Sequence, residues 1–120
     1  MHTFVETTDF SKWRKRFLSD EDYTKLQQEL IASPQRGDVM PGCGGLRKLR
    51  IRDRKRQKGK RGGARIIYLH VPEARRFLML DGYGKDEKDD LAAAEKKDLR
   101  ELAREYRQRV IKTARGATGQ

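Results

Sequence analysis

The first residues change from a β-favouring pattern to a helical one. Residues 3–6 are short and β-favouring, and apolar side chains then recur three or four positions apart at Phe10, Trp13 and Phe17. Residues 7–9 directly before this repeat are all N-cap residue types. The pattern predicts a strand followed by a helix.

A second helical pattern follows at once. Ser19 and Asp22 have the spacing of an N-cap pair, and Pro34 favours an end to the helix. Two consecutive amphipathic helices predict a helical hairpin whose apolar stripes turn inward. The apolar face of the second helix carries Tyr23, Leu26, Leu30 and Ile31.

After a loop, apolar and polar residues alternate with a period of two. Residues 35–45 are rich in Gly and Pro and favour a loop, whereas Leu49 and Ile51 beyond it alternate with polar positions. This alternation predicts a half-buried strand. Its polar face is a row of cations, namely Lys48, Arg50 and Arg52.

The remaining pattern predicts two central strands and a helix. Residues 64–71 are almost continuously apolar, residues 72–75 favour a hairpin turn, and residues 77–80 are apolar again. From about residue 86 to residue 110 the intervals are helical, with acidic residues concentrated at the start, where the helix dipole favours them. The apolar positions of this helix are Leu91, Leu99, Leu102, Tyr106 and Val110.

The order β-α-α-β-β-β-α predicts an α+β fold. We expect a small antiparallel sheet packed by the N-terminal helical hairpin, with a C-terminal helix. A chain of 120 residues has the size of one domain, so we expect one domain over residues 1–112. Residues 113–120 are expected to form a basic flexible tail.

Charge is concentrated in one stretch. The net charge is +11, and residues 47–65 alone hold eleven basic residues and one acidic residue. Such a cluster predicts a focused site for a polyanion, although a solvated charge run in a flexible loop would have the same composition. The candidates for contact with such a polyanion are Lys48, Arg50, Arg52, Arg54, Lys55, Arg56 and Lys58.

Other classes of protein have less support. There is no apolar run long enough to cross a membrane and no export pattern, so we expect a cytoplasmic location without membrane contact. Cys43, His2 and His70 do not form a recognisable metal-ligand set, and no cofactor is expected. The spacing of a P-loop is absent around Gly62 and Gly63, which could also form only a tight turn.

The basic stretch also contains the groups that RNA cleavage needs. A 2′-hydroxyl must be activated, a phosphorane dianion stabilised and a leaving oxygen protonated, and Arg and Lys side chains can supply the second function. Tyr83 could stack on a base or transfer a proton, but it could equally be a packing tyrosine. His70 lies in an apolar strand and is interpreted as structural.

Several sequence blocks together resemble one known family. The blocks LRKLRIR, KGKRGGARIIYLHV and RRFLMLDGYGKDEKDDL, in this order, are similar to the RelE/ParE toxin superfamily, and closest to its HigB-like, RelE-type branch. The resemblance covers nearly the whole chain. It implies cleavage of messenger RNA in the ribosomal A site and inhibition by a cognate antitoxin, expected to be a helix-turn-helix protein.

The resemblance also assigns positions. Lys48 and Arg50 fall on the strand that carries basic catalytic residues in RelE-type toxins, and Arg65 aligns with the arginine that opens the next strand. Lys85 follows a glycine after the last strand, as in the family.

Two positions depart from the family pattern. Asp86 stands where well-known RelE-type toxins have an arginine, and Leu91 and Ala92 stand where a tyrosine is expected. Other groups would have to replace the missing proton-transfer residue. The catalytic candidates are therefore Arg65, Lys60, Arg61, Tyr83 and Lys85. A non-catalytic RNA-binding module and a ParE-like inhibitor of DNA gyrase remain as alternative functions.

Overall fold

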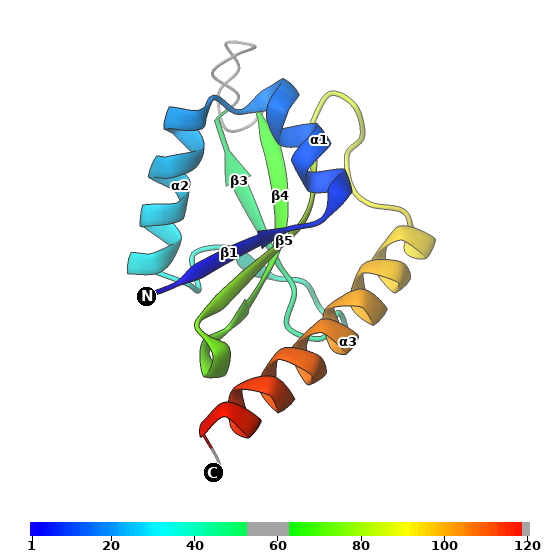
Figure 1. The fold of residues 1–120 in the computed structure, drawn as a ribbon. Helices are drawn as coiled ribbons and strands as arrows, with labels where there is room; N and C mark the ends of the chain where they lie inside the picture. The colour runs from blue at the N-terminus through cyan, green and yellow to red at the C-terminus, as the bar shows by residue number, and fades with distance from the viewer. Residues whose placement is uncertain (53–62, 119–120) are drawn as a thin grey trace.

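A computed structural model describes residues 1–52 and 63–118 (Figure 1). The helices are α1 (Thr8–Phe17), α2 (Asp20–Ala32) and α3 (Ala93–Thr118). The strands are β1 (Thr3–Glu6), β2 (Asp38–Val39), β3 (Arg47–Ile51), β4 (Ala64–Val71) and β5 (Arg76–Gly84). They form one sheet in the order β1-β5-β4-β3-β2. The predicted α+β class, with two N-terminal helices and one C-terminal helix, is confirmed.

The sheet is mixed rather than purely antiparallel. The pairs β2–β3, β3–β4 and β4–β5 are antiparallel, as predicted, but β1 lies parallel to β5, with Phe4 opposite Phe77. A parallel pair needs a long crossover connection, and here that connection includes both N-terminal helices. The two-residue β2 was not predicted because it lies inside the glycine-rich loop and is too short to show a period.

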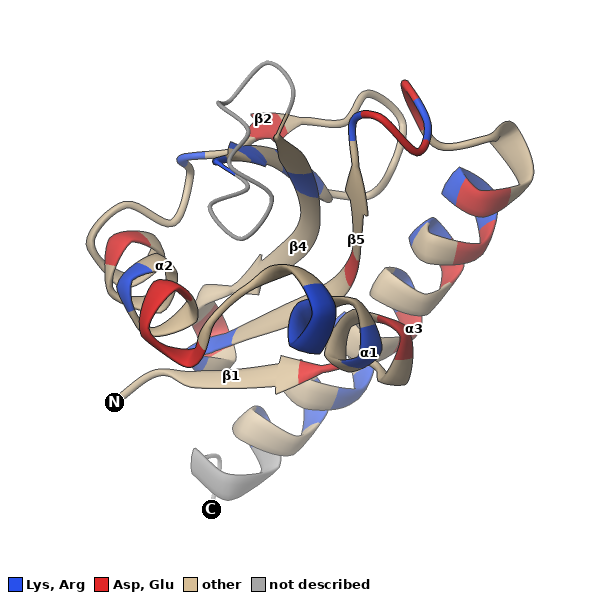
Figure 2. Ribbon diagram, turned by 90° about the horizontal axis from the view of Figure 1, so that it is seen from above, with Lys and Arg blue, Asp and Glu red and all other residues tan. Residues whose placement is uncertain are grey.

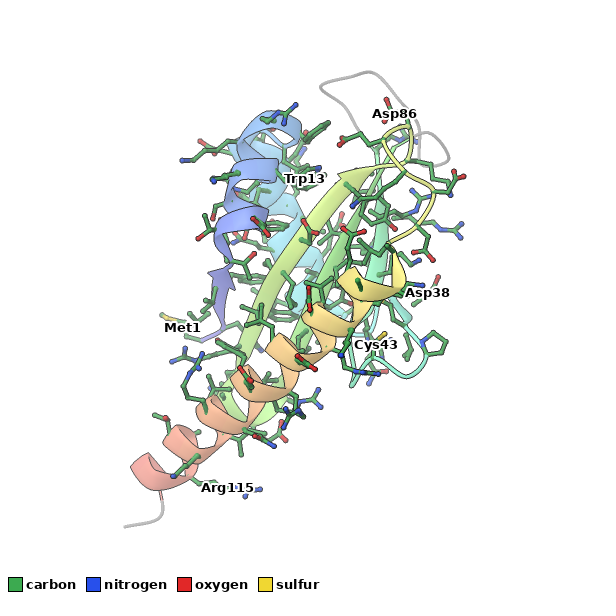
Figure 3. All side chains as sticks on the ribbon, turned by 90° about the vertical axis from the view of Figure 1, so that its right-hand side faces the viewer. Met1, Trp13, Asp38, Cys43, Asp86 and Arg115 are labelled. Carbon is green, nitrogen blue, oxygen red and sulfur yellow. The ribbon has the colours of Figure 1, made fainter. Side chains whose placement is uncertain are left out.

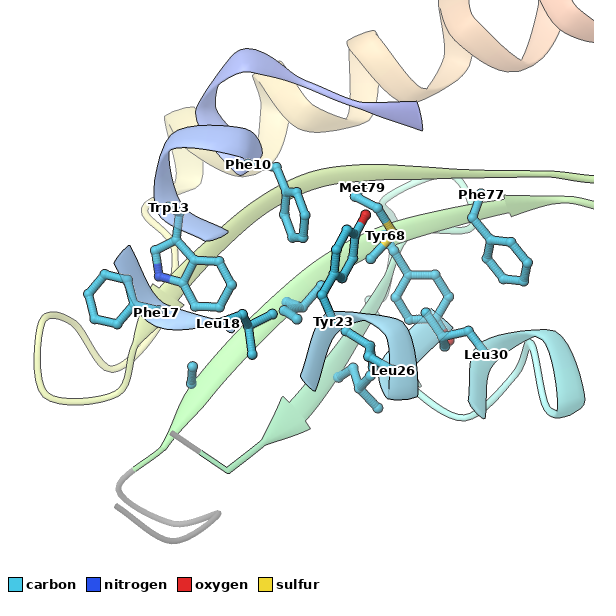
Figure 4. Packing of buried hydrophobic residues seen from close by; sticks show 13 residues of the cluster. Phe10, Trp13, Phe17, Leu18, Tyr23, Leu26, Leu30, Tyr68, Phe77 and Met79 are labelled. Carbon is cyan, nitrogen blue, oxygen red and sulfur yellow. The ribbon is translucent and has the colours of Figure 1, made fainter. Parts of the chain in front are cut away.

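Helices cover both faces of the sheet (Figure 3). On one face, α1 and α2 contribute Phe10, Trp13, Tyr23 and Leu30 to a core shared with alternate residues of β3, β4 and β5 (Figure 4). On the other face, α3 packs Ala103, Tyr106 and Val110 against the opposite set of strand residues, which includes Ile67, Leu69, Val71, Leu78 and Tyr83. This alternation puts the even-numbered residues 48 and 50 of β3 on the α3 side, because Leu49 belongs to the other core.

The two N-terminal helices begin at the predicted caps. The Thr7 hydroxyl accepts a hydrogen bond from the Phe10 N–H at 3.1 Å and donates one to the Leu80 carbonyl at 2.6 Å. The Ser19 hydroxyl accepts from the Asp22 N–H at 3.0 Å. Thr7 therefore both starts α1 and attaches it to β5.

The C-terminal helix starts later than the sequence predicts. Residues 85–87 form a turn closed by the Glu87 N–H on the Gly84 carbonyl, and α3 begins at Ala93. The Glu95 carboxylate accepts a hydrogen bond from the Ala92 N–H at 2.9 Å, which satisfies one free donor at the helix start. The helix then continues to Thr118, past the position where the flexible tail was expected to begin.

The last strand is longer than the predicted 77–80 segment. It reaches Gly84, so Tyr83 lies within the sheet rather than just after it. A β-bulge opposite Ile67 and Tyr68 resets the side-chain alternation, and beyond it Gly82 faces the α1 side. A Cβ at Gly82 would lie 2.4 Å from the Trp13 ring, so this ring packs directly on the strand backbone.

Candidate functional site

Three neighbouring strands place predicted site residues side by side on the α3 side of the sheet. Arg50 of β3 is opposite Arg65 of β4, and Arg65 is in turn opposite Tyr83 of β5. We call these three residues the cross-strand row. Directly opposite residues on one face of a sheet have Cβ atoms about 5 Å apart, so each member of the row lies next to the following one. The row joins positions that lie 15 residues apart (Arg50 and Arg65) and 18 residues apart (Arg65 and Tyr83) in the sequence.

Arg65 is the most unusual member of the row. Among the described residues it is the charged side chain that is buried, with 6% of its surface exposed. Its Nη1 donates to the Ala64 carbonyl at 3.3 Å. A guanidinium is costly to bury unless it is well satisfied, and its position on a central strand fixes where its charge acts.

Tyr83 is buried beside Arg65. Its side chain is 2% exposed, and its hydroxyl has no hydrogen-bond partner within the described part of the chain. Burial, reinforced by the nearby Asp90 carboxylate and opposed by the Arg65 charge, raises the pKa of Tyr83 to about 12. The phenol is therefore a proton donor at neutral pH and a poor general base.

Lys48, the neighbour of Arg50 on the same face of β3, is held by a network of ion pairs. Its Nζ lies 3.1 Å from Oδ1 of Asp90, and Nζ of Lys96 lies 3.0 Å from Oδ2 of the same carboxylate. The Leu91 N–H also donates to Oδ1 at 2.8 Å. These hydrogen bonds, that of Lys96 first, hold the pKa of Asp90 far below its usual range.

The segment between β5 and α3 carries charges of both signs (Figure 2). The Lys85 Nζ donates to the Asp89 carbonyl at 3.2 Å, and its backbone N–H donates to the Gly63 carbonyl at 2.8 Å. The Lys88 Nζ lies 2.8 Å from Glu95 and 5.4 Å from the centre of the Tyr83 ring. Lys85 is thus close to the beginning of β4, and Lys88 covers the Tyr83 ring.

The other predicted residues divide into two groups. Arg50 and Arg52 are exposed, and the end of β3 next to them borders a hollow of about 350 Å³ on the α2 side of the sheet. The rest lie outside the described residues: Arg54, Lys55, Arg56, Lys58, Lys60 and Arg61.

Sequence reasoning missed three contributors to this region, namely Lys88, Asp90 and Lys96. All three belong to residues 85–98, where many Lys, Asp and Glu residues follow one another. Only the folded structure shows which of these side chains contact residues of the sheet. One sequence feature does distinguish Asp90. It directly precedes Leu91, the first apolar residue of the last helical pattern.

The described residues lack two further kinds of feature. Residues 1–52 and 63–118 contain no group of three or more His, Cys, Asp or Glu side chains arranged to hold a metal ion. In the same ranges, no helix has the length and apolar character needed to span a bilayer.

Comparison with known proteins places the chain in a family. The family model described as "RelE toxin of RelE / RelB toxin-antitoxin system" matches residues 1–117. Among solved structures, the chain is similar to the isolated RelE toxin of E. coli, with a TM-score of 0.51 and 16% sequence identity. That match covers 85% of this chain and 99% of the other, and at this identity it shows a shared fold. The match over residues 1–117 confirms the RelE-type resemblance, and the chain belongs to the RelE toxin family, the toxins of RelE/RelB toxin–antitoxin systems.

Proposed function

We propose that this chain is a ribosome-dependent endoribonuclease that cleaves messenger RNA and thereby inhibits translation. The observation that carries the proposal is the cross-strand row, because it sets a buried cation next to a protonated phenol on a rigid sheet face. Membership of the RelE toxin family supports the toxin role. The HigB-like branch remains a prediction from the sequence.

The proposed chemistry divides the charge and proton roles among the row and its neighbours. Arg65 stabilises the negative charge that develops on the scissile phosphate, because a preorganised cation in a buried site acts strongly on such charge. Tyr83 donates a proton or a hydrogen bond, in keeping with its raised pKa. The reaction uses side chains without a metal ion.

The basic residues around the row are proposed to bind the substrate. Arg50 and Arg52 are exposed at the end of β3 and are free to contact RNA phosphates through their guanidinium groups. Lys85 is close to Arg65 in the fold, since its backbone pairs with Gly63 two residues earlier. Lys60 and Arg61 keep the catalytic roles proposed from the sequence.

An antitoxin is the second proposed partner. A family member that acts on translating ribosomes has to be restrained in its own host, and we propose a cognate helix-turn-helix antitoxin for this role. An acidic or amphipathic segment of the antitoxin would match the basic stretch in charge. With the ribosome and an antitoxin as partners, we propose a cytoplasmic location.

The test is cleavage of a defined messenger RNA by the purified chain, with and without ribosomes, mapped by primer extension. We expect cuts at ribosome-bound codons and intact RNA when ribosomes are omitted. Binding without any cleavage on ribosomes would instead indicate a non-catalytic RNA-binding module. Accumulation of cleaved gyrase–DNA complexes in a parallel assay would indicate a ParE-like gyrase inhibitor.

A further inference from the structure

We propose that Lys48 and Lys96 together form a binding site for an RNA phosphate, and that the Asp90 carboxylate occupies its anion position in the free protein. The inference rests on the proposed function, because it takes RNA as the ligand. It adds a contact residue on α3, Lys96, that lies far from the basic stretch in the sequence. It also makes Asp90 a competitor of the RNA.

The geometry of the site is that of an anion held between two cations. The ammonium groups come from different elements, β3 and α3, and they bond the two oxygens of one carboxylate at 3.1 and 3.0 Å. A phosphate group presents two non-bridging oxygens in a similar way and carries a full negative charge. Two lysines and one aspartate leave one positive charge in excess, so the site still attracts a polyanion.

The site is open to solvent. The side chains of Lys48, Lys96 and Asp90 are 28%, 37% and 46% exposed, so a phosphate can reach the ammonium groups. Solvent and salt screen ion pairs between partly exposed side chains, so a polyanion that brings several phosphates can replace the carboxylate. Asp90 itself lies before the first residue of α3, so its movement breaks no backbone hydrogen bond of that helix.

A neighbouring hollow supplies room for a nucleotide. It has a volume of about 210 Å³ and is bounded by the two lysines, by Asp90 and by an apolar wall from β2 and the loop that follows it. Charged groups on one side and apolar groups on the other suit a phosphate attached to a sugar and base. The apolar wall consists of Val39, Met40, Pro41 and Cys43.

If Asp90 had a purely structural role, its removal would affect stability and not RNA affinity. In that case Asp90 only ties the start of α3 to β3, so its removal would lower stability and leave RNA affinity unchanged apart from the effect of net charge. The two roles are separated by comparing Asp90→Asn with Asp98→Asn. Both variants remove one negative charge from the same region, but Asp98 is an exposed residue further along α3.

The experiment measures binding of a single-stranded RNA oligonucleotide by fluorescence anisotropy over a salt series, beside thermal unfolding of each variant. We expect Asp90→Asn to raise affinity several-fold more than Asp98→Asn does, and to steepen the salt dependence. Each added phosphate contact on a single strand changes the slope of log K against log salt by about 0.7. The asparagine Oδ1 can still accept the Leu91 N–H, so the turn before α3 is retained.

Lys96→Gln provides an independent test that leaves the Lys48–Asp90 pair in place. We expect it to weaken RNA binding and, combined with Asp90→Asn, to cancel the gain from that change. Equal affinities for the two aspartate variants, or unchanged binding in Lys96→Gln, would overturn the phosphate site. If the wild-type chain cleaves no messenger RNA while these shifts in RNA binding are observed, the proposed function fails and the phosphate site stands.

Discussion

Arg65 and Tyr83 face each other directly across the two central strands of the sheet, and both side chains are buried. The positive charge of Arg65 favours ionisation of the phenol, yet burial outweighs it and the pKa of Tyr83 rises to about 12. The pair therefore combines a fixed cation with a neutral proton donor. Such a pair suits a reaction in which negative charge grows on a phosphate.

Arg65→Ala is expected to lower the rate of ribosome-dependent cleavage by about two to three orders of magnitude, the usual effect of removing one preorganised contact to developing charge. Ribosome binding should weaken only modestly, because many cations remain. Cleavage, ribosome binding and thermal unfolding are to be measured together. Arg104→Ala, which removes one exposed charge from α3, is the matched control. Near-normal cleavage, or cleavage lost only through unfolding, would refute the catalytic role of Arg65.

Tyr83→Phe is expected to reduce cleavage while the fold is retained, since the lost hydroxyl has no hydrogen-bond partner among the described residues. The pH dependence of stability gives a second test. The folded pKa of about 12 exceeds the ordinary value of 10.0, so the wild type loses stability relative to the Phe variant as the pH rises above 10. Denaturant unfolding at pH 8, 10 and 11 measures this difference. A constant difference across this range would show that Tyr83 is not held in its neutral form.

Asp81→Asn is expected to stabilise the protein at neutral pH. Burial is the main cause of the raised pKa of Asp81, so the folded state pays an electrostatic penalty when this carboxyl ionises. The penalty is absent below the ordinary pKa and is complete once the pH exceeds the folded pKa. The asparagine can still accept the Gly82 N–H that the Asp81 carboxylate accepts at 2.8 Å. Thermal unfolding should show the higher stability of the variant at pH 7 and a smaller difference near pH 4; a lower stability at pH 7 would contradict this account.

Gly82→Ala is expected to destabilise the fold by about 1–3 kcal/mol, the range for overpacking a well-filled core. The new methyl group would lie 2.4 Å from the Trp13 ring, which would have to move away from the sheet. Denaturant unfolding gives the change in free energy.

Trp13→Phe supplies the control, because a smaller ring leaves space for the methyl group. The double variant should be less destabilised than the sum of the two single changes. Strict additivity would mean that the Trp13 ring is not what excludes a side chain at residue 82.

The sequence predicted those parts of the fold that depend on local periodicity and caps. Thr7 and Ser19 begin their helices as expected, and β4 has the predicted bounds. The parallel position of β1 could not be read from its pattern, because periodicity does not specify which strand is the neighbour. The acidic residues after Gly84 resemble a first helical turn, but the turn closed on the Gly84 carbonyl delays the helix.

The candidate site was predicted only in part for a similar reason. Arg65 and Tyr83 were selected by residue type and by position relative to the strands, and the register then brought them together. The Lys48–Asp90 contact joins residues 42 positions apart, and one carboxylate in a run of acidic residues has no distinguishing local signal. Long-range ion pairs of this kind are specified by the assembled fold rather than by the neighbouring sequence.

The parallel pairing of β1 with β5 has a consequence for synthesis of the protein. Residues 3–6 find their sheet partners only at residues 76–79, so the N-terminal strand must wait until most of the chain has been translated. Contacts between such distant residues form late and slowly compared with local ones. The row that contains Arg65 and Tyr83 likewise requires β5 to have emerged. A nascent chain therefore completes this sheet face only near the end of its own translation, which under the proposed function keeps the ribosome that makes the toxin safe from the unfinished product.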